Sequence, residues 1–114
     1  MKTTYIASSN MATNGTAIGS DSERDVVVKS VIIGAPVSGG SITFYTITNP
    51  VGGASTNIAA KITLPTFSTT NVNPGVYVLN FGPGGLVLNE GGNVVIDQTM
   101  QVTVNWETMN DPNA

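Results

Sequence analysis

The densest group of side chains that could do chemistry is the acidic stretch DSERD, which holds Asp21, Glu23 and Asp25. If the chain is extended there, the three carboxylates share one face, because strand side chains repeat every two residues. Three close carboxylates could hold calcium, which takes six to eight oxygen ligands. The stretch lacks the glycine-bearing spacing of a calcium loop, and Arg24 neutralises part of its charge. We therefore expect a solvated loop and no metal site, with calcium binding as the alternative.

A second stretch, GAPVSGGS at 34–41, has the glycine spacing of a phosphate-binding loop. Gly40 stands where that loop needs its lysine, and the following residues have the pattern of a strand rather than a helix. We predict a β-turn between two strands here. Asn14-Gly15-Thr16 matches the N-glycosylation pattern, but Asn-Gly is also a common turn, and we predict a turn there.

The remaining carboxylates are Glu90, Asp97, Glu107 and Asp111, which are spread over turns, strand ends and the tail. A glycosidase needs two carboxylates about 5–10 Å apart in a cleft, and nothing in this spacing indicates such a pair. The chain has no histidine and no cysteine, which excludes Ser-His-Asp and Cys-His catalysis and metal sites built on those ligands. We therefore expect no enzyme activity and no cofactor.

Charge and hydropathy limit the partners. Four Lys and Arg against seven Asp and Glu give a net charge of −3, and without a basic cluster we expect no nucleic-acid binding. No apolar run approaches the ~20 residues that span a bilayer, so we expect no membrane partner. The start, MKTTYIASSN, lacks the apolar core of a signal peptide, which predicts synthesis in a cytoplasm.

The elements that position these residues are short strands. Thirteen glycines and six prolines, with many Thr, Asn and Ser, break the chain into short segments, a rhythm typical of sandwiches and barrels. No window shows a sustained helical stripe, so we expect little or no helix. The predicted fold is an all-β antiparallel sandwich of about 7–9 short strands with an extended N-terminal arm, either jelly-roll or immunoglobulin-like in its connections.

The strand 100–107 has the clearest pattern, because Met100, Val102, Val104 and Trp106 alternate with polar residues. We expect those four side chains in the core. The segments 25–33 and 76–81 are apolar on both faces, as expected for central strands or strands covered by a partner. In 41–48 the apolar positions change parity between Phe44 and Tyr45, which indicates a bulge or a strand buried on both sides. Including 86–88 and 93–97, we count seven strands from residue 25 onward and one or two weak ones before it.

The tyrosines Tyr5, Tyr45 and Tyr77 could each lie at a core edge or in a contact, since a tyrosine ring with a wet hydroxyl serves both.

Three regions follow from this pattern. Residues 1–24 are either an arm that orders against a neighbour, by adding 2–7 to a sheet edge, or a strand and a long loop of the same sandwich. Residues 25–107 form the sandwich, and 108–114 form a frayed tail.

The stretches VKSVIIGAPVSGGSITFYTIT, NIAAKITLP and GLVLNEGGNVVIDQTMQVTVNWE together resemble small β-sandwich virion proteins of tailed bacteriophages, including phages of cyanobacteria. The resemblance covers roughly residues 25–107. It implies a non-enzymatic structural component of the virion, first a capsid decoration or cement protein that bridges capsid subunits. The implied partners are the major capsid protein or another virion protein, and further copies of the chain, with a trimer favoured. The alternative is a tail, knob or fibre component, or a receptor- or carbohydrate-binding module that uses loops 49–56 and 65–75.

Overall fold

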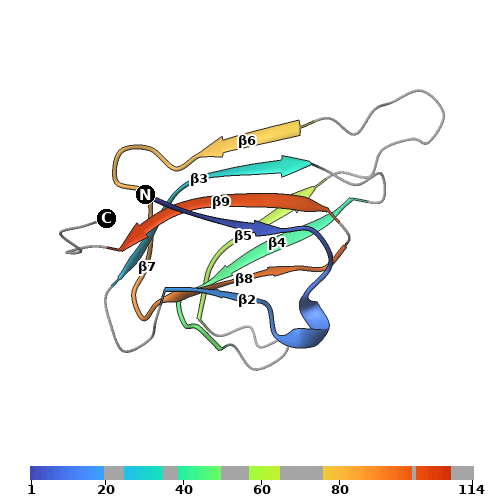
Figure 1. Cartoon of the computed structure of the whole chain (residues 1–114), viewed down its shortest axis with the longest axis horizontal. Coiled ribbons are helices and arrows are strands. Elements are labelled where there is room, and N and C mark those ends of the chain that lie inside the picture. Colours follow the sequence, from blue (N-terminus) through green and yellow to red (C-terminus); the bar gives the residue numbers. More distant parts are fainter. Residues whose placement is uncertain (20–24, 35–38, 50–56, 65–75, 99, 109–114) are drawn as a thin grey trace.

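A computed structural model gives the fold of the chain (Figure 1). It describes residues 1–19, 25–34, 39–49, 57–64, 76–98 and 100–108. Within these ranges the chain forms nine β-strands and a three-residue 3-10 turn, η1 (Met11–Thr13). The strands make two antiparallel sheets that pack face to face, which confirms the predicted all-β sandwich. The acidic stretch at 21–24, the loops 50–56 and 65–75, and the tail 109–114 lie outside the described residues.

Each sheet has four strand positions. Sheet A has the order β1 (Lys2–Ile6), β9 (Gln101–Thr108), β3 (Val26–Gly34) and β6 (Val76–Asn80), and β7 (Leu86–Leu88) also pairs with β3. Sheet B has the order β2 (Thr16–Ile18), β8 (Gly92–Ile96), β4 (Gly40–Tyr45) and β5 (Ile58–Leu64). Figure 1 shows sheet A above sheet B, with β6 at the upper border of sheet A.

The strand order is that of a jelly roll. β6 pairs with residues 30–34 of β3 and β7 with 26–28, so the two lie end to end and act as one interrupted strand. The pairs β1 with β9, β2 with β8, β3 with β6 and β7, and β4 with β5 are then nested. The chain is thus one long antiparallel hairpin wound into two sheets. Of the two connection patterns that the sequence left open, this is the jelly roll.

The core lies between the sheets and is made of aliphatic side chains around one phenylalanine. Phe44 is fully buried and meets Phe81 edge to face, with ring centroids 6.0 Å apart. Val102, Val104 and Trp106 are buried as predicted, and the Trp106 indole donates a hydrogen bond to Thr4 Oγ1 at 2.9 Å. The hydrogen bond satisfies the only polar atom of that ring, as a buried tryptophan requires.

β4 is buried on both faces, which is the second of the two alternatives that the sequence left open for the parity change between Phe44 and Tyr45. The register of β4 against β5 does shift there, but the extra residue is Ala59 of β5, because Phe44 pairs with Ala60 and Tyr45 with Ile58. The register of β3 against β9 shifts between Val28 and Ser30, so Lys29 is an extra residue. Because of this insertion, the inward-facing residues of β3 are Val26 and Val28 before the bulge and Val31 and Ile33 after it. The sequence analysis did not predict this bulge.

The described part of the N-terminal segment belongs to the sandwich. β1 pairs with β9 over its whole length, β2 pairs with β8, and Ile6 and Ile18 are buried in the core. Of the two alternatives for residues 1–24, the described residues 1–19 fit the second, a strand and loop of the same sandwich, because β1 and β2 are the outer neighbours of β9 and β8.

Candidate contact surface

A line of outward-facing side chains crosses β1, β9, β3 and β6 on the outer face of sheet A. Tyr5 lies opposite Thr103, which lies opposite Ile32, which lies opposite Val78. We call these four residues the exposed row. Tyr5 is 61% exposed, Ile32 40% and Val78 66%. All four alternate with residues that point toward the core, so their outward orientation follows from the strand period.

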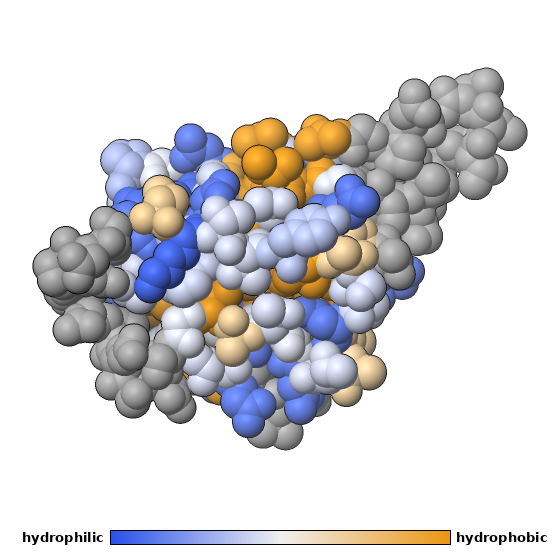
Figure 2. All heavy atoms as spheres, viewed as in Figure 1, coloured by the Kyte–Doolittle hydropathy of each residue, from blue (hydrophilic) through white to orange (hydrophobic). Residues whose placement is uncertain are grey.

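A further exposed valine lies next to the exposed row on β6. Val76, two residues before Val78 and on the same face, lies opposite Gly34 and is 69% exposed. Gly34 has no side chain to cover its neighbours. Figure 2 shows hydrophobic side chains gathered over β6 at the top of the molecule. Contiguous exposed apolar side chains on a sheet face are typical of contact surfaces, whereas single ones are common everywhere.

A polar row borders the exposed row on its other side. Thr3 Oγ1 donates to Asn105 Oδ1 at 3.1 Å, and Asn105 Nδ2 donates to Ser30 Oγ at 2.9 Å. Asn80 lies opposite Ser30 and accepts from the backbone N–H of Gly82 at 3.0 Å. These bonds hold the side chains in fixed positions. The two rows themselves carry no charged side chain, and the ion pair of Lys29 with Glu107 lies beyond the polar row on the same sheet.

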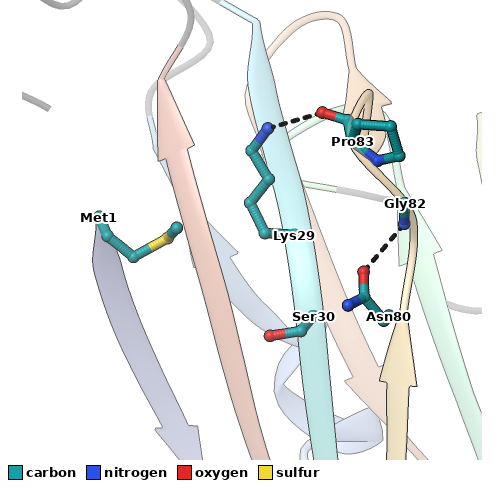
Figure 3. A pocket seen from close by; sticks show the side chains of 6 residues that line it. All are labelled: Met1, Lys29, Ser30, Asn80, Gly82 and Pro83. Carbon is teal, nitrogen blue, oxygen red and sulfur yellow. Dashed lines mark hydrogen bonds between the residues drawn. The ribbon is translucent and has the colours of Figure 1, made fainter.

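A shallow pocket of about 390 Å³ lies at the end of the polar row, next to the β3 bulge. It is lined by Met1, Lys29, Ser30, Asn80, Gly82 and Pro83 (Figure 3). Lys29 Nζ donates to the Pro83 carbonyl at 3.2 Å and lies 3.4 Å from Glu107 Oε1. Both partners hold the ammonium group at the border of the pocket.

The groups that this pocket presents are the Ser30 hydroxyl, the Asn80 amide, the Lys29 ammonium and backbone groups. A nucleophilic serine needs an adjacent base that takes its proton. The group that hydrogen-bonds to Ser30 Oγ is the amide of Asn105, which donates and has no basic nitrogen. Lys29 is engaged by a carboxylate and a carbonyl. The pocket could hold the end of a polar side chain from a partner.

The outer face of sheet B is different, because its own chain covers it. Ser41, Thr43, Asn93 and Val95 alternate with core residues and so point outward, yet all four are buried. A Cβ at Gly15 would overlap Asn93 and Val95, so the turn after η1 lies directly over β8. In the described part of the chain, sheet A is thus the sheet with the bare apolar face.

Of the carboxylates that the sequence singled out, Asp21, Glu23 and Asp111 lie outside the described residues, and Asp97 and Glu107 bind different partners. Asp97 accepts from the backbone N–H and hydroxyl of Ser41 at 2.6 and 2.8 Å, and Glu107 pairs with Lys29. Among the described residues, no three His, Cys, Asp or Glu side chains lie close enough to hold a metal ion. Of the acidic stretch only Asp25 lies in a described range, so the calcium alternative stays a prediction.

The other sequence-predicted features are placed as follows. Gly40 begins strand β4 rather than a helix, as predicted. Asn14 and Gly15 form the predicted turn, with left-handed φ values of 62° and 84°. Tyr45 is buried, whereas Tyr5 is exposed and belongs to the exposed row. For 76–81 the sequence predicted either a central strand or a strand covered by a partner. In the described residues β6 is an edge strand, so the first of these alternatives is wrong.

Within the described residues, no helix is long and apolar enough to cross a membrane. In comparisons with known proteins, no family model matches the chain, and no curated protein or solved structure is significantly similar to it.

Proposed function

We propose that this chain is a non-enzymatic structural component of a bacteriophage particle, a capsid decoration or cement protein. It would bind capsid subunits through the outer face of sheet A and bridge them. The observation that carries this proposal is the exposed row, an uncharged row with Tyr5, Ile32 and Val78 on one sheet face. Such a surface is suited to repeated protein contacts, in which an apolar centre supplies most of the affinity.

The assignment to a phage particle depends on two further supports. One is the resemblance of residues 25–107 to small virion proteins of tailed phages. The other is an analogy of fold, because the jelly roll is used by many viral capsid proteins, although lectin domains and cupins share it. Further copies of the chain would let several weak contacts act together through effective concentration.

The order of the polar row supports binding without an induced change. The polar row is held by the hydrogen bonds from Thr3 to Asn105 and from Asn105 to Ser30. A side chain that is already ordered loses less entropy when a partner binds. The tail, knob or fibre role and the carbohydrate-binding role stay alternatives, and the loops invoked for them lie largely outside the described residues.

Cosedimentation of the purified chain with capsids of the phage that encodes it tests the proposal. Ile32→Glu places a carboxylate in the centre of the exposed row, and burying it unpaired should weaken capsid binding by ~10-fold or more. Ile58→Glu on β5 is the matched control, since both isoleucines are 40% exposed. Equal binding of Ile32→Glu and the natural chain would reject this surface. Absence of binding by the natural chain would reject the capsid role.

A further inference from the structure

The two sheets have four edges in the described residues, with β6 and β7 sharing one of them, and these edges differ in how they are protected against pairing with another chain. Natural proteins protect sheet edges with lysines, with very short strands or by covering the edge. β1 carries Lys2, whose ammonium lies 5.3 Å from the centre of the Trp106 ring, and β5 carries Lys61 at its midpoint. β2 has three residues, and Asn10 continues the pairing of β8 beyond it. Three of the four edges are thus protected.

Within the described residues, β6 has none of these features. Its five residues, VYVLN, include no charge and no proline, and the side chains of Val76 and Val78 are exposed. The backbone N–H of Phe81 donates to Lys29 O at 3.1 Å. Because hydrogen-bonded and non-bonded positions alternate along an antiparallel pair, Leu79 also bonds to β3. The N–H and C=O groups of Val76, Val78 and Asn80 then point to the open edge.

We propose that β6 pairs antiparallel with β6 of a second copy of this chain, around a twofold axis at Val78. Val78 would exchange two backbone hydrogen bonds with Val78 of the other copy, and Val76 would do so with Asn80 on either side of the axis. The two A sheets become one continuous sheet. The exposed row then runs across both copies, with the two Val78 side chains adjacent at its centre.

Three observations favour a second copy as the occupant of this edge. An antiparallel pair of identical strands is self-complementary, as a twofold interface requires. The other edges of a second copy are protected, so β6 is the edge of that copy most open to pairing. The chain is acidic overall, with a net charge of −3, but neither β6 nor the exposed row carries a charge. Two copies therefore meet there without like-charge repulsion.

A cysteine at position 78 tests this geometry directly, because the natural chain contains no cysteine. Directly opposed, hydrogen-bonded residues have Cα atoms ~5.5 Å apart, which is within the range for a disulfide. With oxidised glutathione as electron acceptor, Val78→Cys should give a covalent dimer on a non-reducing gel. Val87→Cys on β7, also an exposed valine, should stay monomeric. No covalent dimer of Val78→Cys, or equal dimer from both variants, would overturn the proposal.

Sedimentation of the full chain at increasing concentration gives an independent test. The natural chain should shift toward a dimer, and Val78→Lys, which brings two like charges together, should raise the dissociation constant ~10-fold or more. Val87→Lys should behave as the natural chain does. A monomer at every concentration, or a trimer that Val78→Lys leaves intact, would overturn the pairing. This inference does not depend on the capsid role, which Ile32→Glu tests separately.

Discussion

Replacing Asn10 with alanine should lower the free energy of unfolding by about 3 kcal/mol. Asn10 is buried, and its side-chain amide forms hydrogen bonds with the backbone of β8, as a neighbouring strand would. Its amide nitrogen donates to Val94 O at 2.9 Å, and its carbonyl oxygen accepts from the Ile96 N–H at 2.8 Å. The same nitrogen also donates to Thr16 Oγ1 at 2.9 Å.

The magnitude follows from the groups that lose their partner. A buried polar group left unsatisfied costs about 1–3 kcal/mol. The Ile96 N–H has one hydrogen to donate, and we assign the loss of its partner a cost of about 2 kcal/mol. Val94 O has two lone pairs and can keep another partner, so we assign it about 1 kcal/mol. Thr16 is only partly buried, so water can replace the bond to its hydroxyl.

Urea denaturation, followed by the fluorescence of the single tryptophan, measures this difference. In a domain of this size, about 3 kcal/mol corresponds to a fall in Tm of roughly 12 °C. Ser9→Ala is the control, because Ser9 Oγ donates to Ile96 O at 3.2 Å while the Asn10 N–H also serves that oxygen. Ser9→Ala should cost less than about 0.5 kcal/mol. An Asn10→Ala variant within about 0.5 kcal/mol of the natural chain would refute the reasoning.

Three further predictions concern stability, and urea denaturation followed by far-UV circular dichroism measures each of them. Phe44→Ala empties the centre of the core and should cost about 3–5 kcal/mol; a loss below about 1 kcal/mol would contradict the packing. Gly15→Ala would strain a φ of +84° and overlap a buried side chain of β8, whereas Gly82→Ala, at φ +81°, meets nothing within 4 Å. Gly15→Ala should therefore cost at least about 1 kcal/mol more than Gly82→Ala, and equal costs would count against the covered face of sheet B. Trp106→Phe leaves Thr4 without its indole donor and should cost about 1–2 kcal/mol, and a double variant with Thr4→Val should recover part of that loss.

Much of the fold could be predicted because its signals are local. The alternation in 100–107 predicted β9, and the parity change at Phe44 predicted a bulge or a strand buried on both faces, of which β4 is the second. The expected seven strands from residue 25 onward, with one or two weak ones before it, agree with the nine observed in the described residues. In each case a few neighbouring residues carry the information.

The features that the sequence analysis missed depend on contacts between distant residues. Asn10 bonds to Val94 and Ile96, which are 84 and 86 positions away, and nothing around Asn10 indicates that partner. The place of β1 beside β9 follows from the nested topology rather than from its own polar sequence. The bulge at Lys29 depends on the register against β9, which a single strand does not specify.

The candidate surface was partly visible in the sequence. Residues 76–81 are apolar on both faces, which predicted a central strand or one covered by a partner. In the structure β6 is an edge strand with Val76 and Val78 exposed. The alternative of a strand covered by a partner therefore stays a prediction. That Tyr5 and Ile32 join Val78 in one row depends on the order of four strands. Sequence alone did not give that order.

The most direct test of the central claim is the copy number of this protein in purified virions of the phage that encodes it. Quantitative mass spectrometry would measure it relative to the major capsid protein. A decoration or cement role predicts copies in near-stoichiometric proportion to the capsid subunits. A few copies per particle would indicate a tail, knob or fibre component instead, and complete absence from the particle would contradict the structural role.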